Sequence, residues 1–504
     1  MRCGKIWIIL KPGAALLCCA ALAFGLALPA PAPVMAAAAS FQAGGYENPR
    51  TIIIAAPGEK AVTTGEYVSL YGACDYNYPL YLNGTAIPYT EHGFFAQYLS
   101  LQMGENRYTL ENNGVVKTVV VTREAKKPAA ADPTGYTPLG GHCVVRLDNI
   151  THRQGPGASY ALLEPVARGA VCAVTGESGP YYRLADGSYI FKSAVSYSGA
   201  ALARNQVQAF KTTPLTEDRS TEIRLKMPAP AYYNVEMQEG QAVLTLYNTA
   251  FAWPPPLKEN AMILDAVLLS EPGATHTRYA FRFQAGMKPA GYYIDFRDGG
   301  LVIGFRHPPA PAADGGLTGL KVLLDAGHGG SEKGALGAAL TAGPAEKDIN
   351  LAITRYAADY LRARGATVIM TRADDAYVSL DDRVAMIKKN NPDIAVSIHN
   401  NSVPNTTDQT TTQGILICYS LPSQAADARF FADRLSAATG RPQSGSGLYD
   451  SNLALTRLTN CPAVLIENAF MSNPDEYEWL LQDGNQNILG TEIGRAIEQR
   501  LLEN

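Results

Sequence analysis

The sequence lacks the features that identify several common classes of protein. Its 42 lysine and arginine residues are balanced by 46 aspartate and glutamate residues, which gives a formal net charge of -4, and there is no long basic run. A protein that binds nucleic acid or another polyanion is therefore not expected. The eight cysteines include no C-x-x-C pair, and the seven histidines include no H-E-x-x-H motif. The zinc-ribbon, dithiol and common zinc-peptidase signatures are thus absent.

Long apolar segments are also scarce, and the one that stands out lies at the start of the chain. Arg2, Lys5 and Lys11 supply positive charge, residues 14–28 are apolar, and small residues follow them. This order is typical of a secretory signal peptide, to which we assign residues 1–36. The alternative is a retained membrane anchor, but the apolar core is shorter than the roughly 20 residues that a spanning helix needs. No transmembrane segment is expected after removal of the signal.

Removal of this signal would leave an odd number of cysteines, which cannot all be paired within the chain. Cys143 and Cys172 lie in one small module and are the best candidates for a disulfide. The alternative is that they are buried free thiols. The cysteines outside the signal are Cys74, Cys143, Cys172, Cys418 and Cys461.

The length of 504 residues predicts three or four domains, and the hydrophobic fraction of 47% allows real cores. From residue 50 to 124, short β-like runs alternate with turns, of which Asn83-Gly84 and Asn113-Gly114 are hairpin signals. This segment is predicted to be a small all-β module, and it resembles bacterial Ig-like domains.

Two further β-rich modules are expected before residue 308. Residues 137–198 resemble a bacterial SH3-like barrel, a family in which a turn and an aromatic strand end line a peptide-binding groove. The nearest equivalents here are residues 153–156 and Tyr181-Tyr182, which are explained equally well as turn and core residues. Residues 205–307 alternate apolar with polar side chains, which fits a half-exposed antiparallel sheet. They loosely resemble β-sandwich targeting domains.

The remaining segment, residues 319–504, alternates predicted strands with predicted helices, which is typical of an α/β domain with an open sheet. The fold class predicted for the whole chain is therefore multidomain, with N-terminal all-β modules before a C-terminal α/β open-sheet domain. Strands are expected near residues 321–325, 366–371, 393–398, 413–419 and 462–467. Helices are expected near residues 346–364, 381–390, 423–438, 474–482 and 486–502.

Four residues of this domain could form a catalytic site. His328, His399 and Glu467 stand at or just after the ends of predicted strands, and Glu346 opens a predicted helix. Ligands collect beyond the carboxyl ends of the strands in an open α/β sheet, so the four side chains are expected to meet at one edge. Two imidazoles and a carboxylate make a catalytic zinc set with one position left for water. A second carboxylate could move the proton of that water.

Each of these residues also has a simpler explanation. A histidine at a strand end is usually a surface or hydrogen-bonded residue, and a glutamate at a helix start normally interacts with the helix dipole. Glu467 is harder to explain in this way, because it follows the apolar run AVLI and burial of an unpaired carboxylate is costly. Spacing alone leaves both interpretations open.

The order of the motifs favours the zinc site. Six motifs follow one another between about residue 320 and 504: VLLDAGHGG, EKDINL, VIMTRADD, SLDDR, SIHNNS and PAVLIENAFMSNPDE. In these motifs and in their order the chain resembles the zinc-dependent N-acetylmuramoyl-L-alanine amidase family. The resemblance implies that His328, Glu346 and His399 bind zinc and that Glu467 is the catalytic carboxylate.

Other residues in or near these motifs have more than one possible role or depart from the family pattern. Ala326 replaces a usual proline and Ala469 a usual glycine, but neither is a ligand, so an active site is expected. The family pattern has an arginine at the position of Arg457, which could contact the substrate or form a structural ion pair. Asp325 could orient the first histidine ligand or cap a turn. Arg383 is expected to tie its helix to the sheet.

The resemblance also implies a reaction and a location. Enzymes of the family cleave the amide between N-acetylmuramic acid and L-alanine, so peptidoglycan is the expected partner of a secreted protein at the cell wall or in the periplasm. The β modules would raise the local substrate concentration by binding the wall. The polar loop 402–412 is expected to rim the cleft without a helical insert. An inactive or regulated wall-binding scaffold and a zinc peptidase acting on stem peptides remain as rivals, and the oligomeric state is not indicated.

Overall fold

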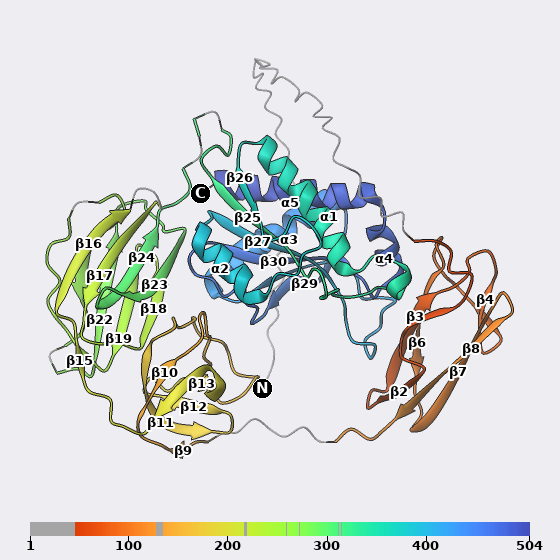
Figure 1. Ribbon diagram of the computed structural model, residues 1–504, viewed down its shortest axis with the longest axis horizontal. Helices are drawn as coiled ribbons and strands as arrows, with labels where there is room; N and C mark the ends of the chain where they lie inside the picture. The colour runs from red at the N-terminus through yellow and green to blue at the C-terminus, as the bar shows by residue number, and fades with distance from the viewer. Residues whose placement is uncertain are drawn as a thin grey trace, which may run out of the picture. The chain divides into compact units, whose positions relative to one another are not determined.

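The structure is a computed structural model, and it describes residues 46–127, 135–215, 219–258, 260–271, 273–310, 312–313 and 315–503 (Figure 1). The predicted signal peptide, residues 1–36, lies outside the described residues. Within the described ranges, no helix has both the length and the apolar character needed to cross a bilayer.

Residues 46–123, which we call the first module, contain two β-sheets with the orders β1-β3-β6 and β2-β8-β7-β4-β5. Side chains from both sheets form one core, in which Leu70, Leu80 and Leu110 are fully buried. Both predicted Asn-Gly turns are present, with positive φ at each residue, a conformation that Asn and Gly adopt most readily. The strands are β1 (Ile53–Ala56), β2 (Lys60–Thr63), β3 (Tyr67–Ala73), β4 (Leu80–Leu82), β5 (Thr85–Ile87), β6 (Phe94–Ser100), β7 (Gly104–Asn112) and β8 (Val115–Arg123).

The second module, residues 137–198, is built on the strand order β13-β12-β11-β10-β14, with β9 paired to β11. Cys143 and Cys172 lie directly opposite each other on β10 and β11, but both are buried free thiols, so the disulfide suggested by the sequence is not formed. The Arg153 guanidinium donates to the carbonyls of Ala158 and Tyr160, which supports a turn role for this residue. The strands are β9 (Thr137–Pro138), β10 (His142–Val145), β11 (Val171–Ser178), β12 (Tyr181–Leu184), β13 (Tyr189–Phe191) and β14 (Val195–Ser198).

The third module, residues 205–307, contains two antiparallel four-stranded sheets, β16-β17-β24-β23 and β18-β19-β22-β21, together with the short pair β15-β20. The antiparallel pairing agrees with the alternation in the sequence. The strands are β15 (Asn205–Gln206), β16 (Ala209–Leu215), β17 (Ser220–Lys226), β18 (Tyr233–Gln238), β19 (Gln241–Tyr247), β20 (Thr249–Ala250), β21 (Ile263–Leu268), β22 (His276–Phe283), β23 (Gly291–Arg297) and β24 (Gly300–Arg306).

Strand β24 departs from the expected half-exposed pattern, because every residue after Gly300 is buried. It is a central strand, and both of its faces are covered. Leu301, Ile303 and Phe305 join a core shared with the second module. On the other face the Tyr293 ring lies over Gly304, where a Cβ atom would come within 2.2 Å of the ring. Coverage of the second face thus explains the difference.

A mixed six-stranded sheet with the order β26-β25-β27-β30-β28-β29 forms the centre of the C-terminal domain, residues 315–503. Its strands are β25 (Lys321–Ala326), β26 (Thr367–Met370), β27 (Ile394–Asn401), β28 (Ile415–Tyr419), β29 (Gln443–Asp450) and β30 (Ala463–Phe470). Its helices are α1 (Glu346–Ala363), α2 (Leu380–Asn390), α3 (Ala425–Thr439), α4 (Pro474–Leu480) and α5 (Asp483–Leu502). All five predicted strands and all five predicted helices are confirmed, and β29 is an additional strand.

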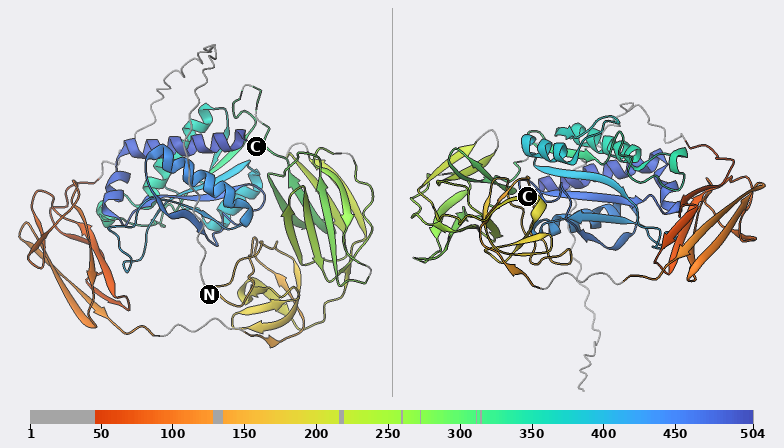
Figure 2. Two further views of the ribbon diagram at one scale, coloured as in Figure 1. Left: turned by 180° about the vertical axis from the view of Figure 1, so that it is seen from behind. Right: turned by 60° about the horizontal axis from the view of Figure 1, so that its bottom comes forward.

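Helices cover both faces of this sheet, as the alternation of apolar side chains along the strands requires. Val322 and Leu324 of β25 share a core with α1, α3 and α5, whereas Leu323 packs on the opposite face with α2. Helices α1 and α5 lie side by side over the first face (Figures 1 and 2).

The direction of β28 determines where one long loop lies. Strands β26, β25, β27 and β30 are parallel, but β28 is antiparallel to β30. Strand β27 therefore ends, and β28 begins, at the same edge of the sheet. The connection between them, residues 402–414, remains along that edge, and we call it the rim loop. It contains turns and no helix.

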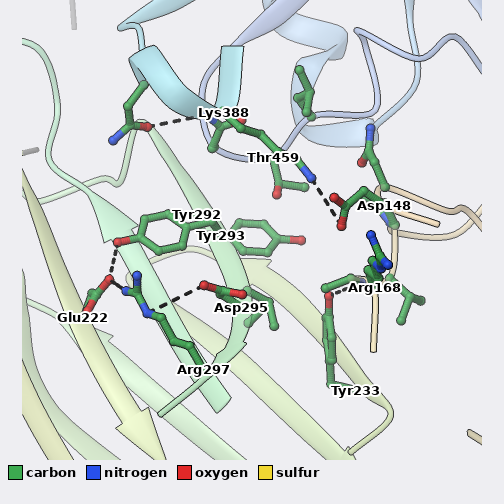
Figure 3. Close-up of a pocket in the computed structure, with 18 of the residues that line it drawn as sticks. Asp148, Arg168, Glu222, Tyr233, Tyr292, Tyr293, Asp295, Arg297, Lys388 and Thr459 are labelled. Carbon is green, nitrogen blue, oxygen red and sulfur yellow. Dashed lines mark hydrogen bonds and ion pairs between the residues drawn. The ribbon is translucent and has the colours of Figure 1, made fainter. Parts of the chain in front are cut away.

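A pocket of about 430 Å³ opens where the third module, the second module and α2 meet (Figure 3). Many of its polar side chains are paired with one another. Tyr293 donates a 2.7 Å hydrogen bond to Glu222, and Arg297 contacts the same carboxylate. Asp148 lies 3.8 Å from Lys388. The two contacts of Glu222 lie within the third module, whereas the Asp148–Lys388 pair connects the second module to α2.

Candidate metal centre and active site

His328 follows β25 in a strained turn. Its φ of 60° lies in the left-handed region, which residues other than glycine adopt infrequently. The carbonyl oxygen of His328 accepts a 2.6 Å hydrogen bond from Arg383 Nη2. Just beyond it, Gly329 and Glu332 exchange backbone hydrogen bonds. These contacts hold the strained turn in place.

Glu346 is the first residue of α1, and only 5% of its surface is exposed. Its Oε2 atom accepts a 2.9 Å hydrogen bond from the Ala335 amide. Its Oε1 atom accepts from Asn350 Nδ2 at 3.2 Å and from the Asn400 amide at 3.3 Å. Residues four apart lie on one helix face, which brings Asn350 beside the carboxylate. Because both oxygens are fixed by several donors, Glu346 has a more specific role than an interaction with the helix dipole.

The three residues predicted as metal ligands form one cluster. His328 Nε2 lies 3.2 Å from Glu346 Oε2, and His399 Nδ1 lies 3.0 Å from Glu346 Oε1. The imidazole centroids are 5.0 Å apart, with the ring planes at 77°. One ligand atom from each residue lies within 4.8 Å of the other two. The fold thus gathers residues that are up to 71 positions apart in the chain at a single point.

The charges of the cluster suit a cation. Burial would raise the pKa of Glu346, but hydrogen bonds from His328 and His399 hold it below its usual value. Burial would lower the pKa of His399, but Glu346 raises it to about 9. The carboxylate therefore attracts positive charge to this point, which a divalent metal between neutral imidazoles would supply. Two imidazole nitrogens and one carboxylate also match the donor set of a catalytic zinc site.

Two glycines leave room for these side chains. A Cβ atom at Gly327 would lie 2.2 Å from Cε1 and 2.3 Å from Nε2 of His399. A Cβ atom at Gly334 would lie 2.4 Å from Glu346 Oε2 and 2.7 Å from His328 Cδ2. Side chains at either position would displace the candidate ligands, so the close packing depends on both glycines.

Glu467 lies on β30, directly beside His399 on β27. Burial raises the pKa of Glu467 to about 7. Its Oε2 atom is buried and has no hydrogen-bond partner among the described residues. An unpaired buried oxygen is costly, and such atoms often mark the place of a water or a ligand. A carboxyl group with a pKa near neutrality can both accept and release a proton.

Comparison with known proteins identifies the domain that carries this cluster. Residues 322–499 match the N-acetylmuramoyl-L-alanine amidase family. Protein YqiI of Bacillus subtilis is 31% identical over 193 residues, which cover 38% of this chain and 89% of that protein. The chain belongs to the N-acetylmuramoyl-L-alanine amidase family. We therefore call residues 315–503 the amidase domain.

Other relatives share the amidase domain. The probable cell wall amidase LytH of Staphylococcus aureus is 35% identical over 169 residues, or 33% of this chain, and the match spans only 53% of LytH. The solved catalytic domain of CwlV, an N-acetylmuramoyl-L-alanine amidase from Bacillus (Paenibacillus) polymyxa var. colistinus, is 30% identical. That match covers 36% of this chain and 98% of the CwlV domain, with a TM-score of 0.33.

Arg457 precedes β30 in the amidase domain and is half-buried. Burial lowers the pKa of Arg457. In the part of the chain that the structure describes, its Nε atom has no hydrogen-bond partner and its guanidinium forms no ion pair. The interpretation as a structural ion pair is therefore not supported, and Arg457 remains a candidate for contact with the substrate.

The hydrogen bonds of Asp325 match neither of the two roles suggested for it, which were to orient His328 or to cap a turn. Its carboxylate accepts 2.6 Å hydrogen bonds from the hydroxyls of Thr371 and Ser397, and it also pairs with Arg383. Asp325, on β25, therefore joins β27, α2 and the residue that follows β26, rather than orienting the His328 ring. Arg383 does tie its helix to the sheet, as expected, and it also holds the carbonyl of the His328 turn.

Sequence reasoning missed several supporting residues. Arg372 donates to the carbonyls of Ala326, Gly327 and Lys347 at 2.8–2.9 Å. Asn468 Nδ2 donates a 2.7 Å hydrogen bond to the His399 carbonyl. The signal for Arg372 was its place directly after a predicted strand in VIMTRADD. Its contacts depend on a turn that lies 45 residues away in the chain, so spacing did not reveal them.

Proposed function

We propose that this protein is a zinc-dependent hydrolase that cleaves the amide between N-acetylmuramic acid and L-alanine in peptidoglycan. The observation that carries the proposal is the convergence of His328, Glu346 and His399 beside Glu467, within a domain of the N-acetylmuramoyl-L-alanine amidase family. The three clustered residues would hold the zinc. Zinc would supply Lewis acidity, which polarises the amide carbonyl and makes water more acidic.

Glu467 performs the proton transfers in this proposal. Its carboxylate takes a proton from water as the water oxygen bonds to the amide carbon. It then gives that proton to the nitrogen as the C–N bond breaks, which releases a carboxylic acid on the lactyl group and the free amine of L-alanine, and the acid then loses its proton near neutral pH. A pKa of about 7 suits both steps, because the group gains and loses a proton at little cost near neutral pH.

Two residues are proposed to assist. The Arg457 guanidinium has unused donors and would contact the substrate near its carbonyl oxygen. Asn468, next to Glu467, holds the His399 carbonyl and so fixes the spacing between the two strands that carry the base and a ligand. The products are a glycan strand and a free stem peptide.

We also propose that the protein acts outside the cytoplasmic membrane, at the cell wall or in the periplasm, after removal of residues 1–36. The three β modules would bind the wall and raise the effective concentration of substrate. Their resemblance to Ig-like, SH3-like and targeting domains supports this role.

The decisive experiment is digestion of purified peptidoglycan by the chain from about residue 37 onward, followed by labelling of newly exposed amino groups. New N-terminal alanine, lost on zinc chelation and restored by added zinc, is the expected result. A new amine on another residue would instead identify a peptidase that cuts within stem peptides. Bound zinc with no new amine would identify a regulated enzyme or a scaffold.

A further inference from the structure

Two adjacent phenylalanines of the first module belong to different cores. Phe95 packs inside the first module with Leu70 and Leu80. Phe94 points the other way, as alternation along β6 requires, and joins the core of the amidase domain. Ala73 of β3 does the same. The module therefore contributes buried side chains to the core of the amidase domain, and the described residues of both belong to one compact unit.

Phe94 is connected through Tyr477 to the segment just before Glu346. Its ring centroid lies 5.0 Å from that of Tyr477 on α4, at an angle of 66°, and 4.8 Å from that of Tyr46. The fully buried Tyr477 donates a 3.0 Å hydrogen bond from its hydroxyl to the Pro344 carbonyl. Pro344 lies two residues before Glu346. One aromatic cluster, Tyr46, Phe94 and Tyr477, thus connects the first module to the start of α1.

Ser69 of β3 holds the rim loop, which begins three residues after His399. The Ser69 amide donates to the Asn405 carbonyl at 2.6 Å, and its hydroxyl donates to the Thr407 carbonyl at 2.7 Å. The same hydroxyl accepts a 3.0 Å hydrogen bond from the Gln409 amide. Ser69 and Gln409 are fully buried. Nearby, the Tyr98 hydroxyl donates to the Thr406 carbonyl at 3.2 Å.

These contacts satisfy backbone groups that the rim loop does not pair within itself. Buried amides and carbonyls need partners, and a loop without them loses its fixed conformation. The loop is joined to the ligand strand at one end. At its other end, Thr412 accepts a 3.0 Å hydrogen bond from Asn473, a residue that follows β30. Its conformation is therefore connected to both strands of the site.

We propose that the first module is a positioning element of the metal centre, and that Phe94 and Ser69 are its positioning residues. Phe94 acts through Tyr477 on the segment before Glu346, and Ser69 acts through the rim loop on the segment after His399. Neither residue touches the metal or the substrate. The inference rests on the proposed zinc site, which zinc binding by the unaltered chain tests separately.

The test compares Phe94→Ala and Ser69→Ala in the full chain with two variants that change the same module elsewhere. Leu99→Ala shortens a side chain that packs on the module's own core, and Ser100→Ala removes an exposed hydroxyl at the end of β6. Zinc dissociation constants are measured by competition with a chromophoric chelator, alongside melting temperatures and steady-state digestion of peptidoglycan.

We expect Phe94→Ala and Ser69→Ala to weaken zinc binding by about 10-fold or more, as loss of groups that orient ligands generally does. Ser69→Thr should restore most of the affinity lost in Ser69→Ala, because it retains the hydroxyl. Ser69→Ala should also raise KM more than it lowers kcat, since the rim loop lies along the edge of the site.

Leu99→Ala and Ser100→Ala should leave the zinc dissociation constant unchanged, even where Leu99→Ala lowers the melting temperature. The proposal is overturned if Phe94→Ala and Ser69→Ala bind zinc as the unaltered chain does, or if Leu99→Ala weakens zinc binding equally at the same loss of stability. Should the unaltered chain bind no zinc, the proposed function fails first and independently of this comparison.

Discussion

Arg383 donates a 2.6 Å hydrogen bond to the main-chain carbonyl of His328. His328 is the first candidate metal ligand along the chain, and its φ is positive. The same guanidinium pairs with Asp325 and donates to the carbonyls of Ala326 and Val378. A planar group with five donors can serve these acceptors at once, which an ammonium group cannot do.

Arg383→Lys should therefore lower both stability and metal affinity while it retains the charge beside Asp325. Loss of two or three donors to buried acceptors should cost about 1–3 kcal/mol of unfolding free energy. Zinc binding should weaken, because the His328 turn is no longer held. Chemical denaturation and zinc titration measure the two effects. Arg355→Lys, which changes a partly exposed arginine that donates to one carbonyl, is the control and should change neither.

Glu467→Gln should abolish turnover and leave zinc binding intact. The amide has nearly the shape of the carboxylate but cannot accept the proton of water, and removal of a general base typically costs roughly 100- to 10,000-fold in rate. Amine release from peptidoglycan and metal content of the same sample give both quantities. Loss of zinc together with activity would instead assign Glu467 to the ligand set.

Gly327→Ala should disrupt the metal centre without unfolding the domain. The added methyl group would overlap the His399 ring, so the imidazole must move away from Glu346. Zinc affinity should fall by at least about 10-fold, in line with other losses of ligand orientation. Gly484→Ala is a suitable control, since a Cβ atom there meets nothing within 4 Å. Equal zinc affinity in both variants would show that the ring has room to shift.

Arg457→Gln should reduce kcat/KM with no change in zinc content. A hydrogen bond from a charged donor is worth about 1.5–3 kcal/mol, which corresponds to roughly 10- to 150-fold. Because the side chain has no ion-pair partner among the described residues, its loss should cost little stability. A large fall in melting temperature with unchanged kcat/KM would instead show that Arg457 has a structural role.

Protonation of His152 should destabilise the second module in mild acid. Burial lowers the pKa of His152 to about 4, although Asp186 opposes the shift. The unfolded chain takes up the proton near pH 6.5 and the folded chain does not, so the stability present above pH 6.5 is lost as the pH falls toward 4. The loss is about 1.4 kcal/mol per pH unit over that range. Urea unfolding at several pH values should show a shallower dependence for His152→Gln than for the unaltered chain.

The sequence predicted most of the amidase domain because its strands and helices have strong patterns. Strand β29, QSGSGLYD, was missed because glycine and serine replace the apolar run that identifies other strands. The reversed direction of β28 also has no local signal, since strand direction depends on which neighbour the strand pairs with. Burial of β24 on both faces depends on Tyr293, which comes from the adjacent strand.

The sequence predicted the candidate metal ligands but not the residues that hold those ligands in place. His328, Glu346 and His399 could be found because each stands at a strand end or a helix start in a motif. Contacts such as Ser69 with Gln409 join residues 340 positions apart and involve backbone atoms, so they leave no pattern of residue types. Only the folded chain shows them.

The reversed direction of β28 has a consequence for how such an enzyme can change. Both ends of the connection from Asn401 to Ile415 are anchored at one edge of the sheet, so its length does not affect the register of any strand. Longer or shorter sequences can be exchanged there at small entropic cost, since loop closure depends only weakly on length. A graft that keeps residues 405–409, which Ser69 holds, can thus change the loop beside the site while the strands that carry the catalytic groups keep their register.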